Sequence, residues 1–316
     1  MTYRVGIIGL GIMGQRMLGN MEQHDAFDVV SVFDPARHVD GQPYAESAAA
    51  LINDPDVDLV YIACPPDFHA EYAIATAEAD KPVFCEKPLG VDLEQSRALV
   101  GTIEGAGVPN AVNFSFASSP SRMFLKRMLA DGAFGGIEAI DIRLHFASWP
   151  RGWQEAASWL AERKQGGYVR EVLSHFIYLT ESVFGPATLE KSIVRYPDGP
   201  EGEAAESHVF ADLSVGGVPL SVAGGVGGTG PDRIEFTVWG SDRSCRLDDW
   251  YTVNVSDGDA WHPDMTDIPD PRQTGRVRQL DSLAAFMAGE AHELPNFRAA
   301  LSVQEIIEGI LAHGLE

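Results

Sequence analysis

The sequence contains very few cysteines. Its 316 residues include only Cys64, Cys85 and Cys245, and no two of them have Cys-x-x-Cys spacing. An odd number without that spacing argues against a disulfide framework and against a structural zinc site. No clustered His, Cys and carboxylate motif appears elsewhere either. We therefore expect reduced thiols and no metal centre.

Long apolar runs are also missing. No segment approaches the roughly 18 consecutive apolar residues that a membrane helix needs. The first residues lack the basic start and the small-residue cleavage site of a signal peptide. These features predict a cytoplasmic protein without a membrane partner.

Basic residues are scarce. Lys and Arg total 23 against 46 Asp and Glu, which gives a formal net charge of -23. An acidic surface repels phosphate backbones and anionic lipids, and no Lys/Arg-rich run offsets this locally, so nucleic acid is excluded as a partner. A dinucleotide is also an anion, so local backbone N–H groups would have to bind it.

A glycine-rich turn stands between a predicted strand and a predicted helix. Residues 3–8 are rich in β-formers, and residues 15–21 favour a helix. In a Gly-x-Gly-x-x-Gly turn the first glycine allows the tight bend, the second lets backbone approach a pyrophosphate, and the third permits close helix–strand packing. The predicted cofactor site therefore starts with Gly9, Gly11, Ile12, Met13 and Gly14.

A carboxylate stands where this motif requires one. The β-rich run 28–33 ends in Asp34, twenty positions after Gly14, where a carboxylate binds the ribose hydroxyls. Because it would repel a 2′-phosphate, we predict NAD as the preferred cofactor. Arg37 could offset that repulsion, so NADP stays possible.

The alternation of strands and helices continues through the first 118 residues. Helices are predicted at 46–53, 70–79 and 93–105, and strands at 59–64, 83–86 and 111–114. This pattern is typical of an α/β fold with a parallel doubly wound sheet, so residues 1–118 are predicted to form a Rossmann NAD(P)-binding domain. Ligands of such sheets bind at the carboxyl ends of the strands, where two loops carry polar residues.

Three motifs resemble one protein family. GLGIMG at 9–14, CPPDFH at 64–69 and CEKP at 85–88 are similar to those of the Gfo/Idh/MocA oxidoreductases, the glucose-fructose oxidoreductase and inositol dehydrogenase family. The resemblance extends through 130–135 and 166–175 to closing helical segments at 283–289 and 300–311. It implies an NAD(P)-dependent dehydrogenase that acts on a secondary alcohol of a sugar, polyol or cyclitol.

The resemblance implies a catalytic role for Lys87. In this family the lysine of Glu-Lys-Pro lies beside the nicotinamide and the reacting hydroxyl, and the Lys-Pro peptide is often cis. Such a group holds the substrate oxygen while hydride leaves the carbon. His69 matches a histidine near the cofactor, but it could equally cap the helix expected from residue 70. The remaining predicted cofactor residues are Asp34, Arg37, Cys64, Pro65, Pro66, His69, Glu86 and Lys87.

The βα alternation ends after residue 118. A helix is predicted at 119–131 and a β-run at 138–146. The later β-runs at 187–195, 207–213, 220–223 and 234–239 have no full helices between them. We predict that residues 119–316 form an α+β domain with a mainly antiparallel open sheet and closing C-terminal helices. Because the family often makes subunit contacts through this sheet, the resemblance implies a homo-oligomer, either a dimer or a tetramer.

Residues 166–178 have the pattern of a helix with two faces. The apolar positions form one buried face, and Glu171, His175 and Tyr178 fall at i, i+4 and i+7, which predicts a polar stripe able to line a cleft. The family has an aspartate and a histidine four residues apart here, and the histidine serves in acid–base chemistry. Glu171 and His175 match these positions.

The replacement of aspartate by Glu171 adds a methylene group, which matters where a placement error of about 1 Å is costly. Gln165 and Leu173 replace two glycines of the family pattern, which implies a narrower substrate pocket. His175 is the predicted proton carrier because an unperturbed histidine has a pKa of about 6.5. Glu171 is assigned to orientation and charge.

Aromatic residues surround Arg151 in the segment 149–153. Aromatic faces stack on sugar rings, and a guanidinium binds carboxylates or hydroxyls, although hydrophobic packing explains the same residues equally well. The predicted substrate residues, for a carbohydrate-like substrate, are Trp149, Arg151, Trp153 and Tyr168.

Two other functions fit the same motifs. Some relatives bind the cofactor and act as regulators without turnover, and others use bound NAD for transient oxidation during glycoside hydrolysis. The presence of Lys87 and His175 argues against the first of these.

Overall fold

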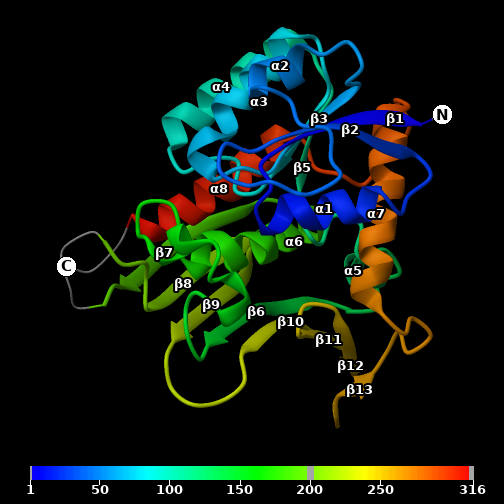
Figure 1. Cartoon of the computed structure of the whole chain (residues 1–316). Helices are drawn as coiled ribbons and strands as arrows, with labels where there is room; N and C mark the ends of the chain where they lie inside the picture. Colours follow the sequence, from blue (N-terminus) through cyan, green and yellow to red (C-terminus); the bar gives the residue numbers. More distant parts are fainter. Residues whose placement is uncertain (1, 198–202, 313–316) are drawn as a thin grey trace. The chain divides into compact units, whose positions relative to one another are not determined.

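The computed structural model describes residues 2–197 and 203–312, which form two compact units (Figure 1). The first unit comprises Met1–Ala117 and Arg276–Gln304, and the second comprises Ser118–Gly275 and Glu305–Glu316. The sequence pattern instead placed everything after residue 118 in the second domain. The segment 276–304 belongs with the first unit because Gln279 donates to the Phe114 carbonyl and Val112 donates to the Pro295 carbonyl.

The first unit contains a parallel five-stranded sheet in the order β2-β1-β3-β4-β5, so the predicted doubly wound architecture is confirmed. Strands β3 and β4 are buried at every position, which explains why their sequences are continuous apolar runs rather than alternating ones. The strands are β1 (Tyr3–Ile8), β2 (Phe27–Phe33), β3 (Leu59–Ile62), β4 (Val83–Glu86) and β5 (Asn110–Asn113).

The helices of the first unit begin at side-chain caps where the sequence supplies them. Ser47 accepts from the Ala50 amide, and Asp92 accepts from the Gln95 amide. The last of these helices ends at Gly107, whose φ of 71° is a left-handed C-cap. The elements are α1 (Ile12–Met21), α2 (Ala48–Asn53), the 3₁₀ turn η1 (Pro66–Phe68), α3 (His69–Glu78) and α4 (Leu93–Ala106).

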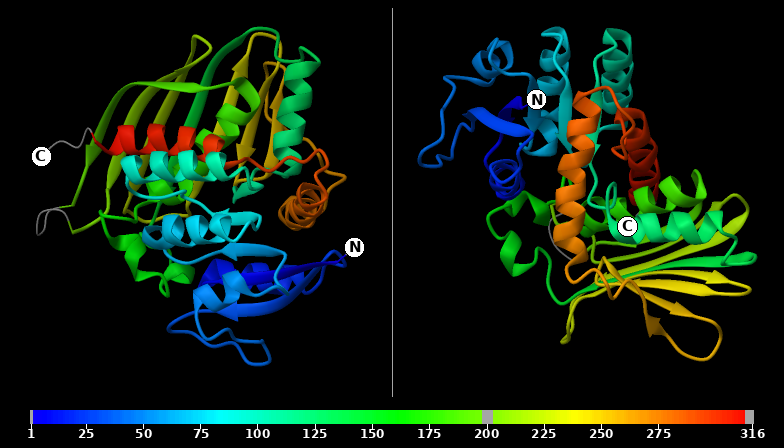
Figure 2. Two further views of the ribbon diagram at one scale, coloured as in Figure 1. Left: turned by 90° about the horizontal axis from the view of Figure 1, so that it is seen from above. Right: turned by 90° about the vertical axis from the view of Figure 1, so that its right-hand side faces the viewer.

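The second unit contains an eight-stranded sheet in the order β13-β12-β11-β10-β6-β9-β8-β7 (Figure 2). Of the strand pairs that the described residues form in this sheet, only β6–β9 is parallel, so the predicted mainly antiparallel sheet is confirmed. The sequence pattern missed β11, β12 and β13, which are short and partly polar. The strands are β6 (Ile137–Phe146), β7 (Ala187–Arg195), β8 (His208–Val215), β9 (Val218–Val226), β10 (Arg233–Gly240), β11 (Ser244–Asp248), β12 (Thr252–Ser256) and β13 (His262–Pro263).

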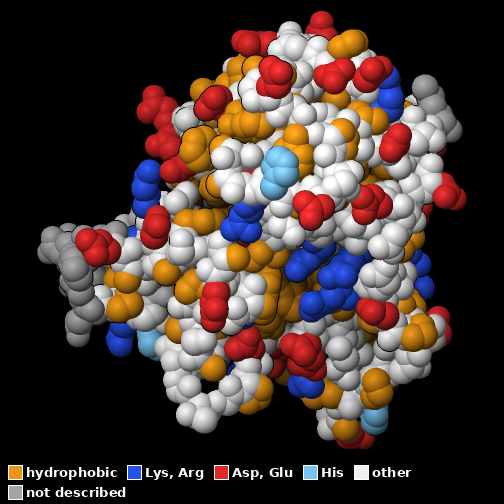
Figure 3. Space-filling model, in the orientation of Figure 1, with side chains coloured by type: hydrophobic (Ala, Val, Ile, Leu, Met, Phe, Trp, Pro, Cys, Tyr) orange, Lys and Arg blue, Asp and Glu red, His pale blue; other side chains and the backbone are white. Residues whose placement is uncertain are grey.

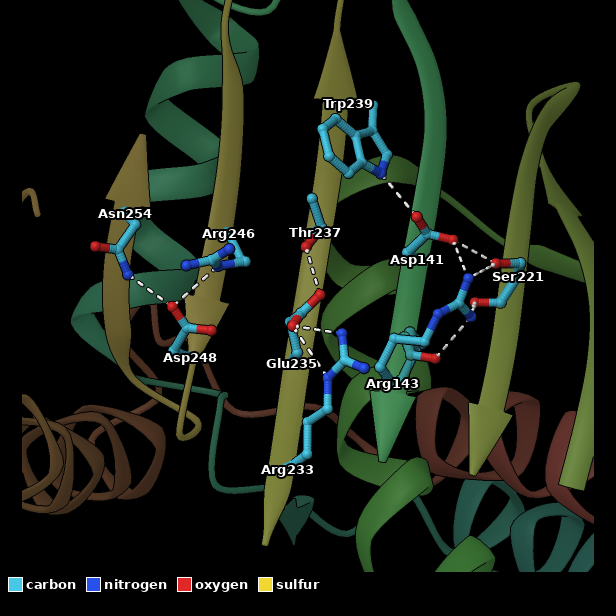
Figure 4. Close-up of polar contacts among 11 residues, drawn as sticks. Asp141, Arg143, Ser221, Arg233, Glu235, Thr237, Trp239, Arg246, Asp248 and Asn254 are labelled. Carbon is cyan, nitrogen blue, oxygen red and sulfur yellow. Dashed lines mark hydrogen bonds and ion pairs between the residues drawn. The ribbon is translucent and has the colours of Figure 1, made fainter. Parts of the chain in front are cut away.

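One face of this sheet is apolar and the other is polar. In β6, Ile140, Ile142 and Leu144 point into the core, whereas Asp141 and Arg143 alternate with them on the outer face. Figure 4 shows the polar contacts of that outer face, which include Trp239 Nε1 donating to Asp141 at 2.7 Å.

Helices cover the apolar face. Phe176 packs on Phe236 of β10 with ring centroids 6.2 Å apart. The two closing helices begin at residues 271 and 297, earlier than predicted. Each of them contains one of the boundaries between the two compact units. The elements are α5 (Pro120–Ala130), the 3₁₀ turns η2 (Gly152–Gln154) and η3 (Ser158–Ala161), the π-helical turn η4 (Val169–Leu173), α6 (Ser174–Phe184), α7 (Pro271–Met287) and α8 (Phe297–Leu311).

Among residues 2–197 and 203–312, no helix has both the length and the apolar character that are needed to cross a membrane.

Candidate active site

The glycine turn follows β1 and begins α1. Gly9 has a φ of 98°, and a Cβ there would lie 2.5 Å from the Cys64 amide nitrogen. A Cβ at Gly14 would collide with the Gly9 carbonyl oxygen. The fold therefore requires both glycines: the first for the bend and its contact with the loop after β3, the third for helix packing.

Gly11 has a different reason to be glycine. Its φ of -68° suits any residue, and apart from its two chain neighbours no described residue has an atom within 4 Å of where its Cβ would stand. The fold does not need a glycine there, but a side chain would fill the space in front of the first amides of α1. Those amides have no partner inside the helix and suit an anion, so the turn fits a pyrophosphate.

Asp34 follows β2 and is bonded to the glycine turn. Its carboxylate accepts hydrogen bonds from the backbone amides of Leu10 at 2.7 Å and of Ala36 and Arg37 at 2.9 Å. Two carboxylate oxygens have about four acceptor positions, which leaves capacity for a ribose hydroxyl. The ribose role of Asp34 and the cofactor role of Arg37 stay predictions.

The loop after β3 carries Cys64, Pro65, Pro66 and His69. Burial raises the pKa of the Cys64 thiol to about 12, so it is a protonated thiol near neutral pH. His69 is buried and is the first residue of α3, whose N-cap is Phe68 without a side-chain bond. The proposed capping role of His69 is therefore wrong. Its ring lies 2.8 Å from the Pro88 carbonyl oxygen and 3.0 Å from that of Cys64.

Glu86 ends β4 and is buried among polar side chains from the neighbouring strands. Its carboxylate accepts hydrogen bonds from the Tyr61 hydroxyl of β3 and the Asn113 amide of β5. Burial and the Glu86 carboxylate raise the pKa of Tyr61 well above its usual value, which keeps the hydroxyl a donor. Glu86 is thus a buried anchor at this edge of the sheet, and its role in cofactor binding stays a prediction.

Lys87 follows this anchor directly. Its peptide bond to Pro88 is cis, as the resemblance implies, and its side chain is partly exposed whereas Glu86 and Pro88 are buried. The residue therefore projects from a fixed backbone at the carboxyl end of β4.

The second unit positions Glu171 and His175 by a turn that contains two glycines. Gly167 has a φ of 96°, and a Cβ there would lie 2.6 Å from Glu206 Oε1. The Glu206 carboxylate, which is buried, accepts a hydrogen bond from the Val169 amide at 2.7 Å. Burial raises the pKa of Glu206 to about 7. Arg170 donates to the Arg163 and Gly166 carbonyls and forms an ion pair with Glu308 of α8.

The predicted continuous α-helical stripe is wrong. Glu171 lies in the π-helical turn η4, and His175 lies in α6 beyond it. A π turn contains an extra residue, which changes the direction of the side chains that follow. The predicted apolar face is nevertheless buried. His175 is 4% exposed and lies edge-on to Trp250 at 5.3 Å, whereas Tyr178 is buried beneath Arg122.

The predicted substrate residues separate into two groups. Tyr168 is fully buried against Phe146 and Trp149, which makes it a core residue, and Trp149 donates to the Leu160 carbonyl. Trp153, by contrast, is 53% exposed beside the guanidinium of Arg151.

Arg151 is connected to Glu171 through one buried amide. Arg151 Nε donates to Gln154 Oε1 at 2.9 Å, and Gln154 Nε2 lies 3.4 Å from Glu171 Oε1. The guanidinium also lies 4.8–5.5 Å from the ring centres of Phe146, Trp149 and Trp153. Substrate recognition by Arg151 and Trp153 stays a prediction.

Several of these residues could not be found from the sequence. Tyr61 was readable as a polar side chain inside a buried apolar run. Gln154, Glu206 and Trp250 give no local signal, because only the fold brings them to η4 and α6. Asn113 lies within a predicted strand, where nothing in the local sequence indicates its hydrogen bond to Glu86.

The surface agrees with the composition. Acidic side chains are spread over the face shown in Figure 3, as a net charge of -23 requires. Among residues 2–197 and 203–312, no three His, Cys, Asp or Glu side chains are grouped so that they could hold a metal ion.

Comparisons with known proteins decide the family. Residues 3–114 match the Gfo/Idh/MocA model described as an oxidoreductase family with an NAD-binding Rossmann fold, and residues 126–313 match its C-terminal alpha/beta domain. The chain belongs to the Gfo/Idh/MocA oxidoreductase family. Family membership accounts for the glycine turn, the Glu86-Lys87-Pro88 triplet and the open sheet in one chain.

Relatives within this family act on sugars and cyclitols. A levoglucosan dehydrogenase from Pseudarthrobacter phenanthrenivorans is 27% identical over 257 residues, which are 74% of this chain and 62% of the relative. An inositol 2-dehydrogenase 2 from Saccharopolyspora erythraea is 34% identical over 145 residues, 43% of each chain. The matched regions cover less than two thirds of either relative.

Solved structures share the fold over almost the full length. A 3-ketoreductase from Actinomadura kijaniata, in complex with NADP and TDP-benzene, has a TM-score of 0.81 at 20% identity and covers 99% of this chain and 98% of its own. An oxidoreductase from Agrobacterium radiobacter, in complex with NAD+, L-tartaric acid and magnesium, has a TM-score of 0.83 at 16% identity. The match covers 99% of this chain and 96% of the oxidoreductase.

Proposed function

We propose that this chain is an NAD(P)-dependent dehydrogenase that transfers hydride between nicotinamide and a secondary alcohol of a sugar, polyol or cyclitol. Its family membership and the named activities of its relatives support the reaction class. The substrate itself is left to experiment, because members of one fold act on many alcohols.

The observation that carries this proposal is a chain of contacts along one edge of the parallel sheet. Gly9 packs against the backbone of Cys64, and the His69 ring connects Cys64 to Pro88. The loops after β1, β3 and β4 are thereby joined. A cation, Lys87, consequently stands at the same edge as the anion-binding turn, where such sheets bind ligands.

We assign the proton chemistry to two side chains. When bound, NAD would supply the hydride acceptor for the alcohol carbon. Lys87 holds the alcohol oxygen, and His175 takes the hydroxyl proton as the C–H bond breaks and the carbonyl forms. Glu171 orients the substrate with Arg151 and Trp153, which the Gln154 amide and the aromatic contacts favour.

NAD is the proposed physiological cofactor. A carboxylate at the end of β2 disfavours a 2′-phosphate, and the Asp34 carboxylate is fixed by three backbone amides. We expect a lower KM for NAD than for NADP. A clear preference for NADP would overturn this assignment and would point to Arg37.

We further propose a cytoplasmic homo-oligomer, a dimer or tetramer, that contacts its copies through the outer face of the eight-stranded sheet. Phe210 and Trp239 are 47% and 42% exposed on that face. A Phe210→Glu change would place a charge there and is expected to lower the molecular mass measured by light scattering. A monomeric wild-type protein would contradict this.

The deciding experiment is the appearance of NADH over a panel of sugars, polyols and cyclitols. Net NADH formation with at least one alcohol is the expected result. Release of a sugar from a glycoside without net NADH would instead indicate NAD-dependent hydrolysis. NAD binding without either reaction would indicate a regulator.

A further inference from the structure

His69 occupies an unusual place for a buried histidine. It is 1% exposed, and its two ring nitrogens face the backbone carbonyls of two separate loops. Nδ1 lies 2.8 Å from the Pro88 oxygen, and Nε2 lies 3.0 Å from the Cys64 oxygen. Pro88 is the residue that follows Lys87, so one end of this ring touches the lysine's own loop.

The chemistry of this ring suits it for holding loops rather than for exchanging protons. Burial lowers the pKa of His69, against the opposing effect of the two carbonyl acceptors. The ring is therefore neutral near pH 7 and donates from one nitrogen only. We place its proton on Nδ1, which lies closer to its carbonyl oxygen than Nε2 does, so that the hydrogen bond runs to Pro88 and Nε2 makes only a close contact with Cys64. With both nitrogens against backbone oxygens, the imidazole is already engaged within the protein.

We propose that His69 is a positioning residue for Lys87, acting through the Pro88 carbonyl. This inference rests on the proposed function, because it concerns where the substrate-holding ammonium stands. On this proposal the turn after β3 acts through the His69 ring, since Cys64 is a protonated thiol and Pro65 and Pro66 have no side-chain hydrogen-bonding groups.

The backbone is fixed on both sides of Lys87. Before it, the Glu86 carboxylate is held by Tyr61 and Asn113 within the sheet. After it, the Pro88 carbonyl faces His69. Removing the His69 contact would loosen the backbone that follows Lys87, while the Glu86 anchor within the sheet stays in place.

Two amide substitutions separate the two contacts of the ring. In His69→Asn the amide nitrogen takes the place of Nδ1, which keeps a donor for Pro88. In His69→Gln the amide nitrogen takes the place of Nε2, which keeps a donor for Cys64. We expect kcat near the wild-type value for His69→Asn. For His69→Gln and His69→Leu we expect kcat to fall about 10- to 100-fold, the cost of a misplacement near 1 Å.

A double-mutant cycle identifies the residue through which His69 acts. In a Lys87→Met background, His69→Leu is expected to change the remaining kcat by less than about twofold, since the residue it positions is gone. Thr76→Val in the same helix removes another buried hydrogen bond, to the Tyr72 carbonyl, and controls for lost stability. Its kcat should not change.

A measurement that needs no turnover separates this inference from the proposed function. Lys87 is one of five lysines, so its rate of modification by trinitrobenzenesulfonate is readable by peptide mass spectrometry against the other four. We expect that rate to change in His69→Gln and His69→Leu but not in His69→Asn. If the wild type oxidises no alcohol, the proposed function fails and this comparison still decides the role of His69.

Three results would overturn the inference. The first is a His69→Leu variant with wild-type kcat and wild-type Lys87 labelling, and the second is a kcat loss from His69→Leu that is just as large in the Lys87→Met background. The third is a His69→Gln variant that keeps its kcat while His69→Asn loses it. The last would show that the contact with Cys64 is the one that matters. If both amide variants lose activity equally, the double-mutant cycle decides whether His69 acts through Lys87.

Discussion

The loop that carries Lys87 and the turn that precedes His175 are built by different means. Lys87 extends from a parallel strand, and side-chain hydrogen bonds to Glu86 and Pro88 hold its backbone. His175 stands in a helix with a buried apolar face, after a glycine turn packed on the buried Glu206. The first arrangement depends on side-chain hydrogen bonds, whereas the second adds close steric fit at Gly167 to the hydrogen bond of Glu206 and the ion pair of Arg170.

This difference predicts different responses to substitution. Changes around Lys87 should alter turnover more than folding, because the sheet beneath remains intact. Changes around the glycine turn should alter folding first, because the start of η4 is packed directly on Gly167 and Glu206.

The largest expected effect is on turnover, from Lys87→Met. A lysine that holds the reacting oxygen contributes through proton and charge chemistry, so we expect kcat to fall about 10²- to 10⁴-fold with unchanged NAD affinity and thermal stability. Steady-state kinetics measures kcat, and NAD titration measures the affinity for the cofactor. Lys81→Met is the matched control, since its ammonium bonds the Asp54 carbonyl away from the loop after β4. Wild-type turnover in Lys87→Met would remove Lys87 from the mechanism.

The next effect is on stability, from Gly167→Ala. A non-glycine residue at a φ of 96° costs about 1 to 3 kcal/mol, and the new Cβ would also collide with the Glu206 carboxylate. Overpacking adds about 1 to 3 kcal/mol, so we expect the free energy of unfolding to fall by about 4 kcal/mol in urea titrations.

Gly185→Ala separates the two causes. Gly185 has a φ of 100°, but apart from its two chain neighbours no described residue has an atom within 4 Å of where its Cβ would stand, so only backbone strain is expected. If both variants lost the same free energy of unfolding, the Glu206 side chain would be moving aside without cost in Gly167→Ala.

The same contrast explains what the sequence could predict. In the first unit, parallel strands bring their carboxyl ends to one edge, so the glycine turn, Asp34 and Lys87 could be placed together from chain order alone. The anchors of that edge were not predictable, because Tyr61 and Asn113 reach Glu86 across strands and no local pattern specifies which buried polar groups will pair.

In the second unit the sequence predicted less. The apolar periodicity of residues 169–177 located the helix and its buried face correctly. It could not reveal the π turn at Val169–Leu173, because one inserted residue leaves the apolar pattern nearly unchanged. Glu206 comes from a distant segment, and its position under Gly167 depends on the sheet's topology rather than on spacing.

A third prediction concerns pH. The pKa of Glu206 rises from 4.5 to about 7 on folding, so between these values the folded protein keeps a proton that the unfolded chain has lost. Stability contributed by this group is therefore full below pH 4.5 and decreases as the pH rises to about 7, by on the order of 3 kcal/mol in total. Glu206→Gln should flatten that decrease in unfolding titrations between pH 5 and pH 8.

Glu104→Gln is the control for this pH effect. Its hydrogen bond with Arg298 lowers the pKa of that exposed carboxyl, so its contribution is lost as the pH falls, the opposite direction. If Glu206→Gln keeps the wild-type slope, the buried carboxyl is not the group that titrates.

The smallest expected effect returns to the Lys87 side, with Tyr61→Phe. This change removes one donor from the buried Glu86 carboxylate while Asn113 remains. A hydrogen bond to a charged group contributes about 1.5 to 3 kcal/mol, and the remaining donor limits the loss to the lower end of that range. Urea unfolding measures it, and kcat should fall along with it because the anchor before Lys87 loosens. Tyr72→Phe, which changes a tyrosine of α3 outside this cluster, should alter neither quantity. A Tyr61→Phe protein with wild-type stability and reduced kcat would mean that Glu86 positions Lys87 without contributing to folding. The Lys87 loop would then affect turnover alone, in even sharper contrast to the turn before His175, where substitutions are expected to affect folding first.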